Sequence, residues 1–313
     1  MREPISALLP IKNGQEWLNT IVYDLNSTLD SRDELIIVDD HSTDSTIEIL
    51  SGIAFKPRLK LLSNPGSGLV SALNEGIKQA TNEWVARYDV DDSYDADRIN
   101  KQMQAITPST VAIFSDYKIW GENKEFFGYI PSPLHPTATA LSLLKSDRTA
   151  HPSVIFRKSA VASVGYYQED DFPSEDLSLW VRLLAEGEIK SIDHALLNYT
   201  LRKSSVSSTR YSEAKMKTER ILCNSFGYKK IAVDAASDFS MIMSTYSQSS
   251  FGVQRKLLFL RDLLSPSIFS SFGVKKRLMT LFYLSAFLIK PTHLFIALQL
   301  AYYQRKRKRY RIH

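Results

Sequence analysis

Cysteine is almost absent from this sequence of 313 residues, which contains only Cys223. A single cysteine cannot form an internal disulfide, and it excludes a cysteine-rich metal site. Long apolar segments are also missing. The N-terminus has no continuous apolar stretch like that of a signal peptide, and no run reaches the roughly 20 residues that a membrane-spanning helix needs. These absences favour a cytoplasmic protein.

Excess charge is absent from the body of the chain. The net charge is +5, but the basic tail at residues 305–313 holds six lysines and arginines, so the remainder stands near −1. Basicity confined to one tail requires no polyanionic partner. The tail has a single aromatic residue, Tyr310, and no motif that recognises nucleic-acid bases, so we expect no nucleic-acid binding. With 44% hydrophobic and 23% charged residues, the chain can form a full core.

Strand and helix patterns alternate through the first 105 residues. Strand-like runs lie at 5–9, 34–38, 59–62 and 84–88, each followed by apolar residues at helical spacing. This order predicts an α/β fold with a doubly wound parallel sheet. Further elements are expected in the second half: strands at 111–115, 117–120, 126–130 and from 151 to 156, and helices at 137–145, 158–164, 174–184 and 209–226. Pro10 is expected to end the first strand.

Three carboxylates follow the fourth predicted strand, at Asp89, Asp91 and Asp92. Crowded carboxylates are costly unless a cation or hydrogen-bond donors meet them, and parallel sheets bind ligands at the carboxyl ends of their strands. Oxygen ligands of this kind suit Mg²⁺ or Mn²⁺ carrying a diphosphate. The alternative is an acidic turn capped by Ser93. The loop 66–68 lacks the third glycine of the dinucleotide fingerprint and the Lys-Ser/Thr of the P-loop, so a plain turn is favoured there.

Five segments, in order and at similar spacing, resemble the N-terminal half of family-2 glycosyltransferases of the GT-A fold. They are Pro10-x-Lys12-Asn13, Val38-Asp39-Asp40-x-Ser42-Thr43-Asp44, Asn74-x-Gly76-Ile77, Ala86-Arg87-x-Asp89-x-Asp91-Asp92 and Asp97-Arg98. The resemblance implies a Rossmann-like, mostly parallel sheet and a nucleoside-diphosphate sugar donor, with a UDP-sugar favoured. It also implies that Pro10, Lys12 and Asn13 bind the donor, Pro10 and Lys12 beside the base, and that Asp40 accepts from the base N3–H.

The same resemblance makes Asp91 the ligand of a Mn²⁺ or Mg²⁺ ion, with Asp89 near the ribose or the metal. A divalent cation would offset the diphosphate charge as it leaves. Residues 199–202 resemble the family's Tyr-Arg-x-His segment, but Thr200 replaces the arginine and Arg202 the histidine. This departure leaves a third protein ligand to the metal open, and it suggests that Arg202 contacts phosphate directly.

Glu175 and Asp176 open a predicted helix, with Ser174 as a natural N-cap. Helix dipoles favour acidic residues in the first turn, so capping alone could explain the pair. The family places a Glu-Asp pair before the same Leu-x-Leu-Trp-x-Arg helix, which implies that Asp176 is the catalytic base of an inverting transfer, with Glu175 as second choice. His151, beside a proline, is interpreted as a structural histidine. The Gln-x-x-Arg-Trp motif of processive synthases is absent, so transfer of a single sugar is expected.

Two apolar segments near the C-terminus, 278–289 and 294–303, are separated by Lys290-Pro291. Each is too short to span a bilayer, and with the basic tail they would suit the inner face of the cell membrane as a peripheral attachment. The alternative is a helical cap packed on the catalytic domain. We therefore expect a GT-A domain at 1–208, with a nucleotide-binding half at 1–105 and an acceptor half at 106–208, followed by a helical C-terminal region at 209–313.

The sequence as a whole predicts a glycosyltransferase that moves one sugar to a hydroxyl acceptor. The acceptor is expected to be a glycan or lipid-linked glycan of bacterial exopolysaccharide, capsule or O-antigen synthesis. Two alternatives stay open. One is a nucleotidyltransferase, which also pairs a sheet with metal-binding aspartates; the other is a catalytically silent nucleotide-sugar-binding subunit of a glycan-assembly complex.

Overall fold

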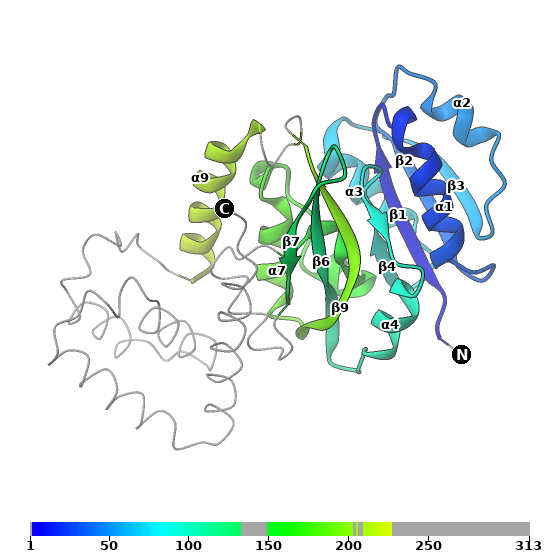
Figure 1. Cartoon of the computed structure of the whole chain (residues 1–313). Helices are drawn as coiled ribbons and strands as arrows, with labels where there is room; N and C mark the ends of the chain where they lie inside the picture. Colours follow the sequence, from blue (N-terminus) through cyan, green and yellow to red (C-terminus); the bar gives the residue numbers. More distant parts are fainter. Residues whose placement is uncertain (1, 133–148, 203–204, 206–208, 227–313) are drawn as a thin grey trace, which may run out of the picture.

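The computed structural model describes residues 2–132, 149–202, 205 and 209–226. In this part of the chain, a nine-stranded mixed sheet has the strand order β3-β2-β1-β4-β8-β6-β9-β5, with β7 paired to β6 (Figure 1). The strands are β1 Ile5–Ile11, β2 Glu34–Asp39, β3 Arg58–Ser63, β4 Trp84–Arg87, β5 Ser93–Tyr94, β6 Thr110–Gly121, β7 Phe126–Ile130, β8 Ile155–Arg157 and β9 Glu188–Leu201.

Helices cover both faces of this sheet. They are α1 Leu18–Thr28, α2 Thr46–Ser51, α3 Gly68–Gln79, α4 Arg98–Gln104, α6 Lys158–Ser163, α7 Glu175–Leu183 and α9 Tyr211–Phe226, with short 3-10 turns η1 Gln15–Trp17, η2 His151–Ser153 and η3 Glu169–Asp171. One hydrophobic cluster joins the sheet to α3, α6 and α7, and a second joins it to α1, α2 and α4. The two clusters make a three-layer α/β/α architecture.

The parallel half of the sheet confirms the doubly wound prediction. Strands β3, β2, β1 and β4 are parallel neighbours. Along β2, Leu35 and Ile37 pack into the α1 side, whereas Ile36 and Val38 pack into the α3 side. A strand buried on both faces reads as a continuous apolar run, which is why this half was visible in the sequence.

Pro10 does not end the first strand, as the sequence suggested. β1 continues to Ile11, and Pro10 pairs with Val38 of β2. Leu8 accepts a hydrogen bond from the Tyr88 N–H on the β4 side, and Ile11 accepts one from the Asp40 N–H on the β2 side. Because residues alternate between the two neighbours, Pro10 faces the β4 side, beyond the end of β4. Its missing N–H therefore costs no hydrogen bond of the ladder.

Three details of the second half also differ from the predictions. The expected strands 111–115 and 117–120 form one strand, β6, with register shifts against β9 around Asp116. The strand expected from His151 begins only at Ile155, because residues 151–153 form a 3-10 turn. The Ser174 hydroxyl does not cap α7; it donates to the Ala214 carbonyl of α9 at 3.0 Å and so ties the two helices together.

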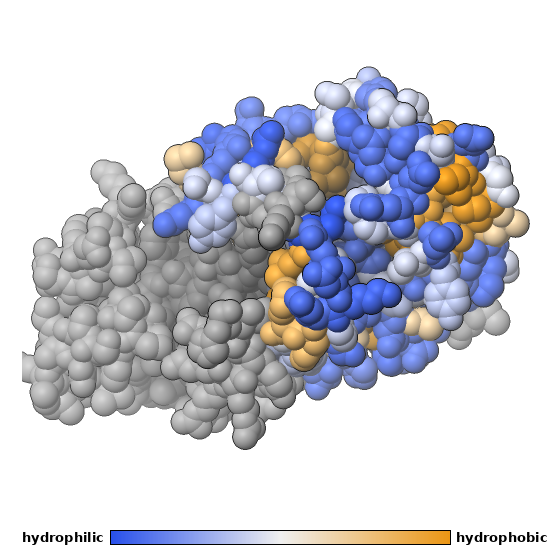
Figure 2. Space-filling model, turned by 45° about the horizontal axis from the view of Figure 1, so that its top comes forward, coloured by the Kyte–Doolittle hydropathy of each residue, from blue (hydrophilic) through white to orange (hydrophobic). Residues whose placement is uncertain are grey.

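The predicted helix 137–145 and the apolar segments at 278–303 lie outside the described residues. Within the described residues, no helix combines the length and apolar character needed to cross a bilayer. The face of the described part seen in Figure 2 is mostly hydrophilic, with separate hydrophobic areas. The exposed large apolar side chains include Phe126 and Phe127 on β7 and Tyr211 and Met216 on α9.

Candidate active site

The carboxyl ends of the parallel strands bring the predicted donor-binding residues to one edge of the sheet. Ile11 at the end of β1 is in register with Asp39 at the end of β2, and Asp89 follows β4. Lys12 and Asn13 leave β1 at this edge and are exposed, whereas Pro10 is buried inside the strand. Lys12 and Asn13 are therefore accessible to a ligand at this edge, whereas Pro10 lies within β1.

Asp40 is buried and organises the neighbouring loops. Its Oδ1 accepts from the Asn64 amide at 2.7 Å and the Gly68 N–H at 2.8 Å, and its Oδ2 pairs with Lys12 Nζ at 3.2 Å. Burial by itself would raise the pKa of Asp40, but these hydrogen bonds outweigh burial and lower the pKa below its usual value. Asp40 is thus held ionised, and its Oδ2 lies next to Lys12, whose side chain is 57% exposed.

Asn13 and the 66–68 loop serve to fix the shape of this edge. Asn13 has a φ of 51°, and its Oδ1 accepts from the Thr43 N–H at 2.8 Å, which ties the β1 loop to the β2 loop. Gly68 has a φ of 86°, and its N–H is already bonded to Asp40. That N–H is therefore taken by a carboxylate of the protein and is not left open to a phosphate, in agreement with a plain turn.

The three aspartates after β4 form a cluster. One carboxylate oxygen from each of Asp89, Asp91 and Asp92 lies within 4.8 Å of the others. Asp92 is 3% exposed; its Oδ1 accepts from the Thr200 N–H at 2.8 Å, and its Oδ2 has no hydrogen-bond partner. Burial, together with the charges of Asp89 and Asp91, raises the pKa of Asp92 well above its usual value. These hard oxygen donors, one of them buried and unsatisfied, fit a Mg²⁺ or Mn²⁺ ion.

Two arginines neutralise part of this cluster. Arg87, at the end of β4, is buried and pairs with Asp89 at 2.5 Å. Arg202, just after β9, pairs with Asp91. Burial comes first in raising the pKa of Asp91, followed by the nearby charge of Asp89, while Arg202 opposes both. Sequence reasoning named Asp92 only as one of three crowded carboxylates and assigned no role to Arg87, although both lie inside the segment that it singled out.

A cavity of about 500 Å³ joins this cluster to the second acidic pair. Its walls include Asp89 and Asp91 on one side and Glu175 and Asp176 on the other. We call it the Asp176 cavity. Asp176 is half-buried, with Oδ1 accepting from the Leu177 N–H at 2.7 Å. The structure thus brings together two acidic clusters that are more than 80 residues apart in the chain.

Glu175 differs from Asp176 in its surroundings. It is 5% exposed, and its Oε2 has no hydrogen-bond partner. Burial, and next the charge of Asp176, raise the pKa of Glu175 to about 8. Because a general base must be ionised to accept a proton, a carboxyl that is largely protonated near neutral pH is a poor base. The burial of Glu175 beside a second carboxyl therefore favours Asp176 over Glu175 for that role.

Ring side chains stand beside Glu175, and two of them, His151 and Trp180, line the Asp176 cavity. His151 Nε2 lies 2.7 Å from the Tyr167 hydroxyl, and His151 Nδ1 lies 4.0 Å from Glu175 Oε1. Burial, and then the charge of Arg87, lower the pKa of His151 well below its usual value, so the ring is neutral. Trp180 of α7 packs edge-on against His151 at a centroid distance of 5.7 Å. His151 is well partnered, as the structural interpretation expected, but it also forms part of the cavity wall.

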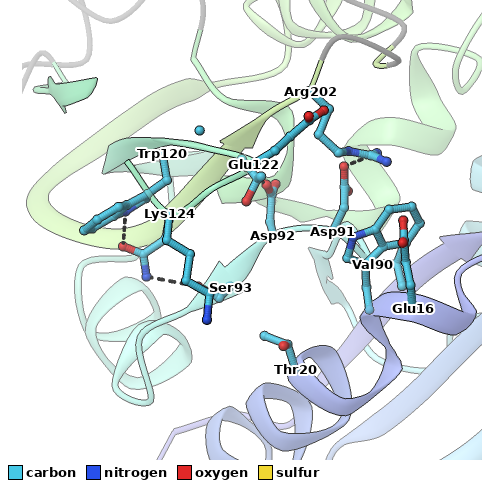
Figure 3. A pocket seen from close by; sticks show the side chains of 14 residues that line it. Glu16, Thr20, Val90, Asp91, Asp92, Ser93, Trp120, Glu122, Lys124 and Arg202 are labelled. Atoms are coloured by element: carbon cyan, nitrogen blue, oxygen red, sulfur yellow. Dashed lines mark hydrogen bonds and ion pairs between the residues drawn. The ribbon is translucent and has the colours of Figure 1, made fainter. Parts of the chain in front are cut away.

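A second cavity of about 760 Å³ lies on the other side of Arg202, between the start of α1 and the β6–β7 turn. We call it the Trp120 cavity (Figure 3). The two cavities share Asp91, Thr200 and Arg202 as wall residues. The lining of the Trp120 cavity also includes Glu16, Trp17, Asp92, Trp120, Glu122 and Lys124. Nothing in the sequence indicated this second space, because its walls come from four separate segments.

Comparison with known proteins identifies the family. Residues 6–164, about half of the chain, match the family profile described as glycosyl transferase family 2. The chain is 27% identical over 215 residues to the Escherichia coli UDP-Glc:alpha-D-GlcNAc-diphosphoundecaprenol beta-1,3-glucosyltransferase WfaP, covering 67% of this chain and 82% of WfaP.

Solved structures share the fold. The S. aureus TarS fragment 1-349 in complex with UDP-GlcNAc has a TM-score of 0.60 and 18% identity, covering 83% of this chain and 79% of that chain. The mannosyltransferase PcManGT from Pyrobaculum calidifontis in complex with GDP-Man and Mn²⁺ has a TM-score of 0.54 and 14% identity, covering 97% and 85%. These likenesses confirm the predicted GT-A fold. The chain belongs to glycosyl transferase family 2 and is a glycosyltransferase.

Proposed function

We propose that this glycosyltransferase moves one sugar from a UDP-sugar, with inversion at the anomeric carbon, to a hydroxyl of a lipid-linked saccharide during synthesis of a bacterial surface polysaccharide. The observation that carries the proposal is the meeting of the aspartate cluster and Asp176 in one cavity of about 500 Å³. The names of WfaP and of the TarS complex, which specify UDP-Glc and UDP-GlcNAc, support a UDP-sugar donor.

In this proposal, Asp176 takes the proton of the acceptor hydroxyl as its oxygen attacks the anomeric carbon. The bond from that carbon to the diphosphate breaks on the opposite face, and a single displacement inverts the centre. Asp91 and Asp89 would hold a Mn²⁺ or Mg²⁺ ion, which offsets charge on the departing diphosphate when bound. The Arg87 guanidinium fixes Asp89, since the two groups are 2.5 Å apart in a buried setting.

Glu175 serves a different purpose from Asp176. In its protonated form the carboxyl has an O–H to donate, and its Oε2 is not engaged by the described residues. It lines the same cavity as Asp176, so it contributes a neutral polar group to the cavity wall and leaves proton abstraction to its neighbour. His151 and Tyr167 hold the wall behind it.

The proposal keeps the domain division expected from the sequence. The GT-A domain covers 1–208, and the region 209–313 attaches the enzyme to the inner face of the cell membrane, where a lipid-linked acceptor would be found. The apolar segments and cations at 275–277 and 305–311 support this part of the proposal. A nucleotidyltransferase is disfavoured by the family match.

Two substitutions test the assignment of roles. Asp176→Asn removes the base but keeps the size of the side chain, so transfer should fall by about 10²-fold or more while UDP–Mn²⁺ binding changes little. Asp91→Ala should instead weaken Mn²⁺-dependent UDP binding, measured by calorimetry. Transfer at the wild-type rate by Asp176→Asn would remove Asp176 from the mechanism. If Asp176→Asn lost as much UDP–Mn²⁺ binding as Asp91→Ala, the two acidic clusters would not have separate roles in catalysis and in binding.

A further inference from the structure

Arg202 lies against Asp91, one of the carboxylates proposed to hold the metal ion. Its guanidinium pairs with the Asp91 carboxylate, as the dashed line in Figure 3 shows, and its central carbon lies 4.4 Å from the centre of the Trp17 ring. A guanidinium over an aromatic face is attracted by the ring as well as by its carboxylate partner. Asp91 is therefore neutralised by a group of the protein before any cation arrives.

The two arginines of the cluster differ in their freedom to move. The Arg87 side chain is 4% exposed and is enclosed by the sheet, whereas the Arg202 side chain is 22% exposed and stands between two cavities. Arg202 also lies at the end of β9, so it can change direction without breaking a strand. The Trp120 cavity and the Asp176 cavity provide space on either side of it.

A divalent cation bound to Asp91 would repel the guanidinium on the same carboxylate, and Arg202, unlike the buried Arg87, has space to move away. The guanidinium would need another anion, and a diphosphate offers planar pairs of oxygens that match its donors. We propose that Arg202 is an exchangeable counter-ion: it holds Asp91 in the free enzyme and transfers to the diphosphate of the donor when the cation takes Asp91. The inference rests on the proposed function and adds a residue that couples metal binding to nucleotide binding.

This exchange has a thermodynamic consequence. Without nucleotide, the cation must displace Arg202 from Asp91, and no diphosphate is present to take the displaced guanidinium. With nucleotide present, the diphosphate supplies that partner, so UDP and Mn²⁺ each increase the affinity for the other. By linkage, the two increases must be equal. Removing the guanidinium should strengthen the binding of Mn²⁺ alone and weaken its dependence on UDP.

The test is a titration of the full-length protein with Mn²⁺, followed by the electron paramagnetic resonance signal of free Mn²⁺, with and without UDP. In the wild type, UDP should tighten Mn²⁺ binding by about 10- to 100-fold, within the usual range for coupled sites. Arg202→Gln should bind Mn²⁺ alone about tenfold tighter and lose about tenfold of the UDP effect. Arg202→Lys should keep part of the coupling, because a cation remains.

Two further variants keep the test decisive. Trp17→Leu removes the ring that holds the guanidinium, so it should shift Mn²⁺ binding in the same direction as Arg202→Gln but less, and it serves if Arg202→Gln does not fold. Arg32→Gln, which removes a surface arginine paired with Asp30, should change neither titration. If Arg202→Gln or Trp17→Leu leaves the Mn²⁺ affinity unchanged while UDP–Mn²⁺ binding is intact, the exchange by Arg202 is overturned and the proposed function is not affected. A folded wild type that binds neither Mn²⁺ nor UDP overturns the proposed function as well.

Discussion

Replacing Glu175 by glutamine should stabilise the protein at neutral and alkaline pH. The carboxyl is 5% exposed, its Oε2 has no hydrogen-bond partner, and Asp176 is the next residue. Burial first, and the charge of Asp176 second, raise its pKa from 4.5 to about 8. The folded protein must therefore either keep this group protonated or carry a buried, poorly compensated charge. Glutamine has the same shape as the protonated acid and never carries that charge.

The sign and size of the effect follow from linkage between protonation and folding. A carboxyl whose pKa is raised by folding stabilises the protein fully below pH 4.5, and this stabilisation is lost as the pH rises toward 8. At about 1.4 kcal/mol per pH unit, the full loss reaches up to about 5 kcal/mol for the isolated group. Coupling to Asp176 shares this change between the two carboxyls, so a loss of about 2–5 kcal/mol is expected between pH 5 and pH 8.5.

Urea unfolding of the wild type and Glu175→Gln at pH 5 and at pH 8.5 measures this difference directly. The two proteins should be similar in free energy of unfolding at pH 5, and Glu175→Gln should be the more stable at pH 8.5. Glu48→Gln, on an exposed turn of α2, is the matched control and should follow the wild type. Parallel wild-type and Glu175→Gln curves across this pH range would show that Glu175 is not held protonated, and the choice of Asp176 as base would lose its support.

Two other predictions concern packing and membrane attachment. Gly76→Ala should lower the free energy of unfolding by about 1–3 kcal/mol, because the added Cβ would lie 2.1 Å from Leu8 Cδ1. Gly52→Ala is the control: its Cβ would meet only the Ile49 carbonyl at 3.5 Å, so the free energy of unfolding should change by less than about 0.5 kcal/mol. Equal losses for the two variants in urea unfolding would refute the packing argument. Truncation after about residue 270 should release the protein from vesicles containing anionic lipid; continued sedimentation of the truncated chain with the vesicles would place the attachment elsewhere.

The parallel half of the fold could be read from the sequence because its signals are local. Each strand is an apolar run ending in polar residues, and each helix repeats its apolar side chains at its own spacing. β6 was broken into two predicted strands because Asp116 interrupts its apolar pattern. In the structure, Asp116 is fully buried and accepts hydrogen bonds from the Tyr129 hydroxyl and the Ser132 N–H. These donors come from β7 and the residues after it, and the predicted strand at 126–130 does not show that its side chains will meet Asp116.

The candidate site was also only partly predictable. Sequence segments indicated the acidic clusters, but they did not indicate which arginines pair with the aspartates. Arg87 and Arg202 read alike in the sequence, each near a segment that resembles the family. Only the fold shows that Arg87 is enclosed with Asp89, whereas Arg202 reaches Asp91 from more than 100 residues away and stays partly exposed. The Arg87 side chain is 4% exposed and that of Asp89 is 25% exposed, so separating this pair would leave a buried guanidinium without its partner, which is strongly destabilising. Arg202 is then the arginine that can move. In the proposed exchange, its guanidinium leaves Asp91 to the cation and pairs with the diphosphate.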